Sequence, residues 1–394
     1  MAEEIVITGL GVVSPIGCDQ DRFWDSLCAG RSGAAPVDCL DTSELPRKIG
    51  CQVRQPIEVG RPMGRAAQLA VAASRQAIAS AGLQTADLPA GRLAVTVGTT
   101  MGETDFIEER LGATEQDWLA ADQMRRVVDN RPGSIARHVQ ADVGVTGPVA
   151  DLYGACAAGN LAIAAARRSL LEGRSDVVLA GGADGFSRLA FLGFMRLRVM
   201  AAEVCRPFDE KRDGLLVGEG SAIFVLERES SARARGAAIR ARVAGCGVTC
   251  ESYHPTRPDP DGDGLTRAAN NALAEAALKP EEIAYVCAHG TGTPQNDAIE
   301  VKVLQRCFPK GVAFSSIKAL TGHTMGAAAA IEIACCVLSL EHQTLIPTWN
   351  LENAIPCDGL DALAGGPRPA QMRYVLNNSA GFGGYNSGVI LAVA

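Results

Sequence analysis

The sequence predicts an α/β fold, because short apolar runs alternate with helical patterns along all 394 residues. Hydrophobic residues make up 47% of the chain and charged residues 21%, a balance that is typical of a soluble globular protein with a large core. Glycine or polar turn residues bound each apolar run, as they do around buried strands of βαβ units. The predicted strands occupy residues 5–8, 93–97, 177–180, 222–226, 283–288 and 374–377.

The first predicted strand leads into Gly-Leu-Gly at residues 9–11, which resembles the start of a dinucleotide-binding turn. Ser14 stands where the third glycine of that motif belongs, and Pro15 would disrupt the helix that should hold the pyrophosphate. An acidic residue near the end of a second strand, which would support the alternative, is missing. We therefore do not expect this chain to bind a nicotinamide cofactor.

A tight turn of small residues at 153–159 carries Cys156 and leads into an alanine-rich helical stretch at 160–172. A thiol at a helix N-terminus faces unpaired N–H groups and about half a positive charge, which favour the thiolate. A cysteine in such a stretch also fits a buried packing role, since free cysteine is among the most buried residue types. Cys156 becomes a candidate nucleophile only if the fold supplies partners for it.

Two of the five histidines supply such partners. His289 follows the predicted strand 283–288, and His323 follows the strand-like segment 312–314 and precedes a second alanine-rich helix at 327–340. Either histidine alone fits a hydrogen-bonded structural role as well as a catalytic one. Together with Cys156, at strand-to-helix junctions, they predict a Cys-His-His site whose members are distant in sequence and adjacent in the fold.

Composition excludes several classes of partner and location. The net charge is −7 and no Lys/Arg block exceeds a pair, so we do not expect nucleic-acid binding. The thirteen cysteines show neither a Cys-x-x-Cys pair nor a secretory N-terminus, which predicts reduced thiols in a cytoplasmic protein. A membrane span needs about 20 apolar residues, and we expect none here.

Five ordered motifs resemble those of the β-ketoacyl-acyl carrier protein synthases of the I/II, elongating type, in the thiolase superfamily. These motifs are the turn around Cys156, the segment 206–220, the turn at 289–293, the segment 318–323 and the glycine turn at 381–384. The resemblance implies two similar five-stranded βαβ halves in a five-layer αβαβα sandwich. We expect residues 1–240 to carry the nucleophile and residues 241–394 to carry both histidines.

The resemblance implies a decarboxylative Claisen condensation of an enzyme-bound acyl group with malonyl-acyl carrier protein, in fatty acid, polyene or polyketide elongation. Cys156 would accept the acyl group, and the backbone N–H groups of Cys156 and Phe382 would form the oxyanion hole. His289 and His323 would donate hydrogen bonds to the malonyl thioester oxygen. Further residues implied are Lys318, which fixes His323, with Glu332 as its ion-pair partner and Thr291 and Thr293 in support. We expect no metal and no cofactor, because phosphopantetheine of the carrier protein delivers the substrates.

The resemblance also implies gates, a pocket and a docking patch. Phe194 and Phe382 would be gates, and the far end of the acyl pocket would be lined by Glu103, Asp105 and Ile107. Because burying unpaired carboxylates is costly, we expect short, unsaturated or oxygenated acyl chains. The acidic carrier protein would dock on Arg61, Arg65, Arg196 and Arg198.

The expected assembly is a homodimer, or a heterodimer with a ketosynthase-like partner. A noncatalytic chain-length or scaffold subunit with the same fold is the alternative function. That alternative leaves the complete set of Cys156, His289 and His323 unexplained.

Overall fold

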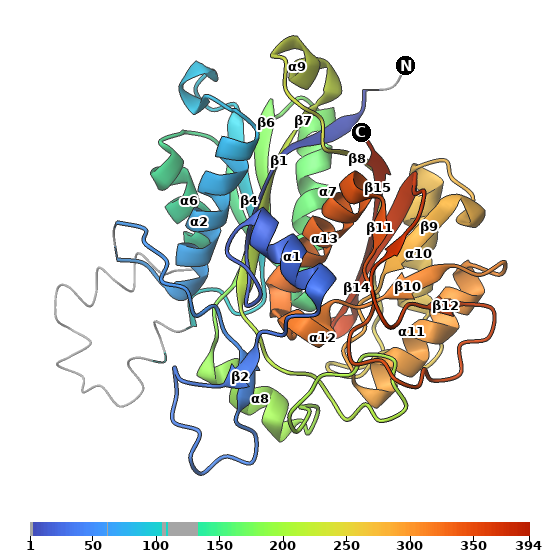
Figure 1. Cartoon of the computed structure of the whole chain (residues 1–394). Helices are drawn as coiled ribbons and strands as arrows, with labels where there is room; N and C mark the ends of the chain where they lie inside the picture. Colours follow the sequence, from blue (N-terminus) through green and yellow to red (C-terminus); the bar gives the residue numbers. More distant parts are fainter. Residues whose placement is uncertain (1–2, 61, 105–107, 109–132) are drawn as a thin grey trace.

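The computed structural model describes residues 3–60, 62–104, 108 and 133–394, which form two five-stranded halves joined edge to edge (Figure 1). The N-terminal half has the strand order β5-β4-β6-β7-β1, and the C-terminal half has the order β10-β9-β14-β15-β8 with the short β12 beyond β10. The strands are β1 Ile5–Val13, β4 Leu93–Thr99, β5 Val149–Tyr153, β6 Val177–Asp184, β7 Gly220–Arg228, β8 Ala241–Cys250, β9 Ile283–Cys287, β10 Ala313–Ser315, β12 Asp361–Ala362, β14 Tyr374–Gly381 and β15 Tyr385–Val393.

The two halves share one topology, which confirms the predicted duplication. β4 runs parallel to β5 and β6, and β9 runs parallel to β10 and β14. β7 and β15 are each antiparallel to both of their neighbours. The halves meet where β1 pairs with β8 over two residue pairs, Val6 with Arg242 and Ile7 with Ala241. The boundary predicted at residues 240 and 241 falls just before β8 and stays a prediction.

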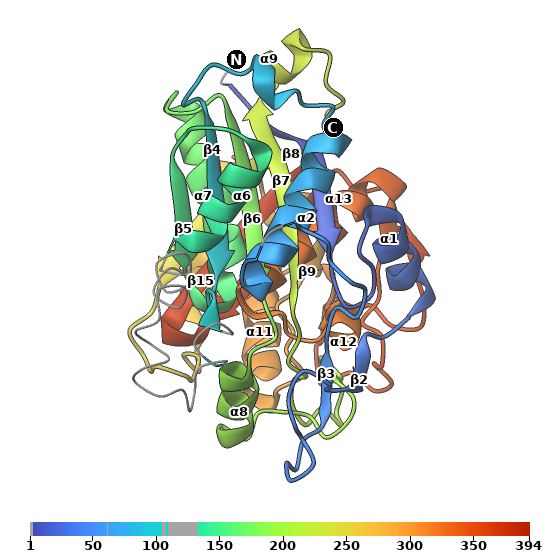
Figure 2. The ribbon, with the colours of Figure 1, turned by 90° about the vertical axis from the view of Figure 1, so that its left-hand side faces the viewer.

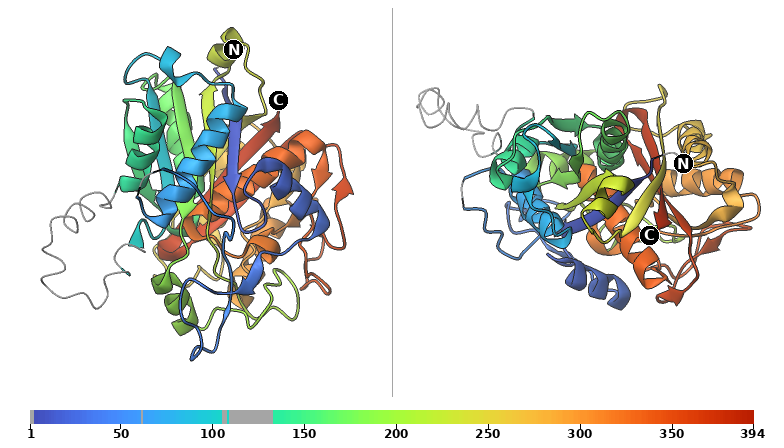
Figure 3. Two further views of the ribbon diagram at one scale, coloured as in Figure 1. Left: turned by 60° about the vertical axis from the view of Figure 1, so that its left-hand side comes forward. Right: turned by 90° about the horizontal axis from the view of Figure 1, so that it is seen from above.

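The helices complete a five-layer αβαβα arrangement, as the resemblance implied (Figures 1 and 3). α2 and α6 cover the outer face of the N-terminal sheet, and α10 and α11 cover the outer face of the C-terminal sheet. α7 and α13 pack against each other between the two sheets. These six helices are α2 Arg65–Ser80, α6 Ser134–Val143, α7 Ala158–Leu171, α10 Asp263–Glu275, α11 Pro294–Cys307 and α13 Ala328–His342.

Shorter elements surround this sandwich. α8 lies at the end of the molecule away from the termini, in Figure 2 as in Figure 1. Among the described residues, the other helices and strands are α1 Gln20–Ala29, α8 Arg188–Arg196, α9 Glu229–Ala234, α12 Lys318–Thr321, β2 Ala34–Pro36, β3 Ile49–Cys51, β11 Thr344–Leu345 and β13 Arg368–Pro369.

The central helix α13 is buried on all sides up to Leu340. Its close neighbour is α7, where a Cβ on Gly159 would lie 2.6 Å from the backbone nitrogen of Ala330. Residues 325–342 are long and apolar enough to cross a membrane, and 89% of this stretch is buried inside the protein. Its apolar character therefore has an explanation in the core between the two sheets.

Strand β1 is longer than the predicted strand 5–8, because the Gly-Leu-Gly segment continues it. A Cβ on Gly9 would lie 2.1 Å from the carbonyl oxygen of Ala77, and a Cβ on Gly11 would lie 1.9 Å from that of Ala73. Both carbonyls belong to α2. These glycines permit close packing of a helix on a strand, which accounts for the pattern that resembled a phosphate-binding turn.

The duplication places two equivalent turns at the centre of the molecule. The turn η2, Ala155–Ala157, precedes α7, and the turn η4, Met325–Ala327, precedes α13. Ala155 has φ +47° and Met325 has φ +53°, a left-handed conformation that is strained for residues with a side chain. The two turns contact each other, so the chain segments that they hold meet between the halves.

Candidate active site

Cys156 lies in the turn before α7, as the sequence predicted, and is 6% exposed. Its carbonyl oxygen accepts a hydrogen bond of 3.0 Å from the hydroxyl of Ser379 on β14. Gly381 lies so close that a Cβ there would be 3.0 Å from the backbone nitrogen of Cys156. The C-terminal half therefore fixes the backbone of the candidate nucleophile from the opposite side.

Burial raises the pKa of the Cys156 thiol to about 12, although the Lys318 ammonium and the backbone N–H of Phe382 act in the opposite direction. The expectation that the helix start makes Cys156 a resting thiolate is therefore wrong. The loss of water around a buried sulfur outweighs the partial charge at the helix terminus. The thiol is neutral until a substrate or a base changes its surroundings.

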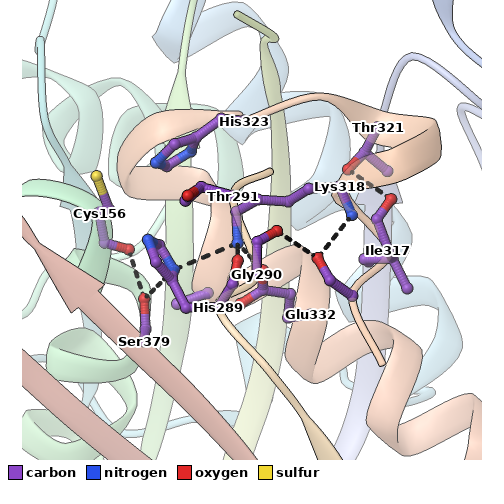
Figure 4. A network of polar contacts seen from close by, with 12 residues as sticks. Cys156, His289, Gly290, Thr291, Ile317, Lys318, Thr321, His323, Glu332 and Ser379 are labelled. Carbon is purple, nitrogen blue, oxygen red and sulfur yellow. Dashed lines mark hydrogen bonds and ion pairs between the residues drawn. The ribbon is translucent and has the colours of Figure 1, made fainter. Parts of the chain in front are cut away.

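His289 follows β9, and a buried cation supports it (Figure 4). The Lys318 ammonium donates to the His289 carbonyl oxygen at 2.6 Å and lies 3.3 Å from its Nδ1, and it forms a buried ion pair with Glu332. The resemblance implied that Lys318 fixes His323. The ammonium contacts His289 instead, while the implied pair with Glu332 is present.

His323 precedes η4 and is oriented by the backbone of that turn. Its Nδ1 accepts a hydrogen bond of 3.1 Å from the N–H of Met325. The two imidazole rings of His289 and His323 meet edge to face, with ring centroids 5.3 Å apart and an interplanar angle of 83°.

Both imidazoles are neutral. Burial, followed by the nearby Lys318 ammonium, lowers the pKa of His289 and of His323 well below the usual value. An ammonium can only donate, so Nδ1 of His289 accepts, and Nδ1 of His323 accepts from Met325. Each neutral ring therefore carries its proton on Nε2, which assigns both Nε2–H groups as donors.

The sulfur of Cys156 and one nitrogen of each histidine lie within 4.8 Å of one another. Among the described residues, these three side chains also form the group that could hold a metal ion. Thiolate and imidazole are ligands that zinc accepts. The same arrangement places a nucleophile beside two neutral N–H donors, which suits a carbonyl that develops negative charge.

These three side chains line a cavity of about 500 Å³. The implied supporting residues Thr291 and Thr293 line it as well. Phe194 from α8 and Phe382 from the glycine turn stand over the site, with ring centroids 5.8 Å apart, and the Phe194 ring is 6.2 Å from that of His323. The two predicted gates therefore contact each other beside the candidate catalytic groups.

The predicted far end of the pocket needs a correction at Glu103. This residue is not among those lining the cavity, and its carboxylate accepts a hydrogen bond of 2.9 Å from the N–H of Ala67 in the first turn of α2. Glu103 therefore supplies the cap that the N-cap residue Gly64 lacks. Asp105 and Ile107 lie outside the described residues.

The predicted docking residues divide into three kinds. The prediction that Arg65 receives the carrier protein is wrong. Its guanidinium pairs with buried Glu219 at 2.9 Å and donates to the carbonyl of Val53, so Arg65 has a structural role. Arg196 and Arg198 are exposed at the end of α8, and Arg198 lines the cavity mouth. Arg61 lies outside the described residues.

Sequence reasoning missed Ser379, whose hydroxyl lies 3.4 Å from Nδ1 of His289 and also holds the Cys156 carbonyl. It also missed Glu300, whose carboxylate accepts from the N–H groups of His289 and Gly290 at 2.7 Å. Burial raises the pKa of Glu300 to about 7. Glu300 lies in α11, eleven residues after His289. It follows Asn296 by one helical turn, and this spacing along the helix was the feature of the sequence that could have located it.

The chain matches two known families in succession. Residues 2–232 match the β-ketoacyl synthase N-terminal domain, and residues 240–352 match the β-ketoacyl synthase C-terminal domain. The 3-oxoacyl-[acyl-carrier-protein] synthase 2 of Synechocystis sp. is 34% identical over 98% of this chain and 96% of that protein. The tetracenomycin polyketide synthase ketoacyl synthase alpha subunit of Streptomyces glaucescens is 34% identical over 99% of this chain and 97% of that protein.

Solved structures agree with these matches. The ishigamide ketosynthase/chain length factor is 36% identical, with a TM-score of 0.94 over 100% of both chains. A type II polyketide synthase acyl-carrier protein in complex with its ketosynthase is 28% identical, with a TM-score of 0.91 over 100% of both chains.

Proposed function

Because the chain belongs to the β-ketoacyl synthase family, we propose that Cys156, His289 and His323 divide the chemistry of that family between them. The protein is a 3-oxoacyl-[acyl-carrier-protein] synthase, an acyltransferase. It condenses an enzyme-bound acyl group with malonyl-acyl carrier protein, releases carbon dioxide and gives 3-oxoacyl-acyl carrier protein.

In the first half-reaction, Cys156 takes the acyl group from the carrier thioester. The sulfur forms a bond to the acyl carbon, the bond to the pantetheine sulfur breaks, and the Cys156 proton goes to the leaving pantetheine thiolate. The N–H groups of Cys156 and Phe382 stabilise the negative charge that develops on the carbonyl oxygen when the sulfur adds to the acyl carbon.

In the second half-reaction, the malonyl thioester loses carbon dioxide and its C2 attacks the acyl carbon on Cys156. The electron pair of the broken C–C bond first rests on the thioester oxygen as an enolate, and the Cys156 thiolate leaves at the end. The Nε2–H groups of His289 and His323 stabilise the enolate oxygen. Lys318 keeps Nδ1 of His289 an acceptor, which holds the proton on Nε2.

The proposal requires no metal ion and no redox cofactor, since decarboxylation supplies the electron pair and N–H donors stabilise the charge. We also propose that phosphopantetheine of an acyl carrier protein delivers both substrates through the mouth beside Arg198. A soluble, cytoplasmic location fits the burial of the one long apolar helix found among the described residues.

The partner protomer is either a second copy of this chain or a ketosynthase-like chain. One similar structure is a ketosynthase/chain length factor, and another is a ketosynthase with its carrier protein. Fatty acid and polyketide synthases among the relatives are equally similar, at 34% identity. Glu103 does not line the cavity and Asp105 lies outside the described residues, so the expected preference for short, unsaturated or oxygenated acyl chains stays a prediction.

A noncatalytic chain-length subunit is the second candidate function. The observation against it is that Cys156 and both histidines lie together and line one cavity. Incubation with acyl-acyl carrier protein, followed by mass spectrometry, distinguishes the two functions. A catalyst gains one acyl group on Cys156, and a Cys156→Ala variant gains none, whereas a noncatalytic subunit stays unmodified in both forms.

A further inference from the structure

A carboxylate from a distant part of the chain satisfies the start of α8. Glu108 accepts hydrogen bonds from the N–H of Arg188 at 2.8 Å, the N–H of Leu189 at 2.7 Å and the hydroxyl of Ser187 at 2.6 Å. Ser187 is itself the N-cap and accepts from the N–H of Ala190. Together the two side chains satisfy three of the four N–H groups that a helix start leaves unpaired, and the negative charge suits the helix dipole.

This helix carries the gate. Phe194, near the end of α8, lines the active-site cavity and contacts the rings of His323 and Phe382. With nine residues, α8 is too short to be stable on its own, so packing and capping determine where it sits. Its packing anchor is Phe191, whose ring is 5.8 Å from that of Phe186.

Among the described residues, nothing packs closely on the outer face of α8 at Leu189 and Gly193. Leu189 is 59% exposed and Leu197 is 45% exposed, and a Cβ on Gly193 would have no atom within 4 Å. In the part of the chain that the structure describes, Phe194 and Met195 also pack against the apolar cluster around Phe191, and the cap is the polar connection that fixes the start of the helix. A change at Glu108 should be transmitted along two turns of helix to Phe194.

We infer that Glu108 is a positioning residue of this synthase, which caps α8 and thereby holds Phe194 closed over Cys156 and the two histidines. The inference rests on the proposed role of Phe194 as a gate. Glu108 itself touches neither the cavity nor a reacting atom, so it acts through α8 alone.

The test measures alkylation of Cys156 by iodoacetamide in the folded protein at fixed pH, with peptide mapping to separate this cysteine from the other twelve. In Glu108→Ala, α8 loses its cap, Phe194 moves away more often, and the Cys156 rate rises by about tenfold, the order that loss of a cap allows. Glu108→Gln keeps one acceptor oxygen and gives a smaller rise. If Glu108→Ala does not fold, Glu108→Gln carries the same test.

The matched control is Asp19→Ala. Asp19 caps α1 by accepting from the N–H of Arg22 at 2.8 Å, and α1 contributes none of the described residues that line the cavity. This variant loses a helix cap and a similar amount of thermal stability, and its Cys156 rate stays at the wild-type value. A rise equal to that of Glu108→Ala would mean that any lost cap loosens the site, which overturns the inference.

Phe194→Ala separates the inference from the function on which it rests. If Glu108 acts through Phe194, Phe194→Ala accelerates alkylation and Glu108→Ala adds nothing in that background. Two results would overturn the positioning role and leave the gate intact. In the first, Glu108→Ala raises the alkylation rate equally in both backgrounds. In the second, Phe194→Ala raises the alkylation rate and Glu108→Ala does not. An unchanged rate in Phe194→Ala removes the gate itself, and the inference falls with it.

Discussion

At the scale of single residues, the site depends on one buried cation. Lys318 is 1% exposed and contacts both Glu332 and His289. Burial raises the pKa of Glu332 well above its usual value, and the Lys318 ammonium is the main group that opposes this shift. The cation therefore stabilises a buried carboxylate and at the same time sets the tautomer of a histidine.

Lys318→Met should lower the free energy of unfolding by about 3 to 5 kcal/mol, because it leaves the Glu332 carboxyl buried without its partner. Malonyl turnover should fall further than this loss of stability explains, since Nδ1 of His289 loses its fixed donor. Thermal unfolding and single-turnover decarboxylation measure the two effects. The double variant Lys318→Met/Glu332→Leu should regain stability and stay slow. Recovery of turnover in the double variant would contradict a role for Lys318 in orienting His289.

The raised pKa of Cys156 gives a pH prediction. A thiol reacts as the thiolate, so the alkylation rate of Cys156 should rise about tenfold per pH unit from pH 7 to pH 10 without a plateau. The sign follows from a folded pKa of about 12, which keeps the neutral thiol dominant throughout that range. Free cysteine, with a pKa of about 8.5, is the reference and levels off within it. A plateau of the Cys156 rate near pH 7 would mean that the helix start and Lys318 outweigh burial.

At the scale of elements, close packing of glycines holds the sandwich together. Gly11→Ala should lower the free energy of unfolding by about 2 kcal/mol or more, because the new Cβ would lie 1.9 Å from the carbonyl of Ala73 and α2 would have to shift. Gly366→Ala is the control, since its Cβ would have no atom within 4 Å, and it should change stability by less than about 0.5 kcal/mol. Chemical denaturation compares the two. Equal effects would show that the strand and α2 can separate without cost.

The strand that carries Ser379 shows why elements were predicted better than the contacts between them. The segment 374–377 predicted the start of β14, but the strand continues through Asn378 and Ser379, which are polar and buried like Asn377. Polar residues indicate a turn in a sequence, and only the packed neighbour α7 shows why Asn377 is inside, hydrogen-bonded to Asn160. Motifs located Cys156 and both histidines. Tertiary packing decides which of the two histidines Lys318 contacts, and local sequence patterns do not predict that packing.

At the scale of the whole molecule, the duplication explains where the site lies. In each half, the third strand in chain order, β5 or β10, leads to one of the two equivalent turns, η2 with Cys156 and η4 just after His323. His289 follows the second strand of the C-terminal half, β9, which lies beside β14 and its Ser379. The nucleophile therefore comes from one half and both N–H donors from the other, so chemistry requires the docked halves.

The exposed end of α8 makes a final prediction about the carrier protein. Arg198 lines the cavity and Arg196 is exposed two residues before it, so an acidic carrier should gain from both charges on approach. Arg196→Glu/Arg198→Glu should raise the KM for the carrier-bound substrate about tenfold, the factor that corresponds to about 1.4 kcal/mol, and should weaken its dependence on salt.

Arg168→Glu is the matched control for that measurement. Arg168 is exposed near the far end of α7, about 15 Å along the helix from the start that follows Cys156, and its pair with Glu172 is a surface contact of little energetic weight. In steady-state kinetics, the double variant should raise the KM for the carrier-bound substrate and leave the KM for a free pantetheine thioester unchanged. Arg168→Glu should change neither KM. An equal rise in KM for the free thioester would show that the two arginines shape the cavity mouth instead of receiving the carrier. Because α8 also bears Phe194, that outcome would place both arginines in the gate.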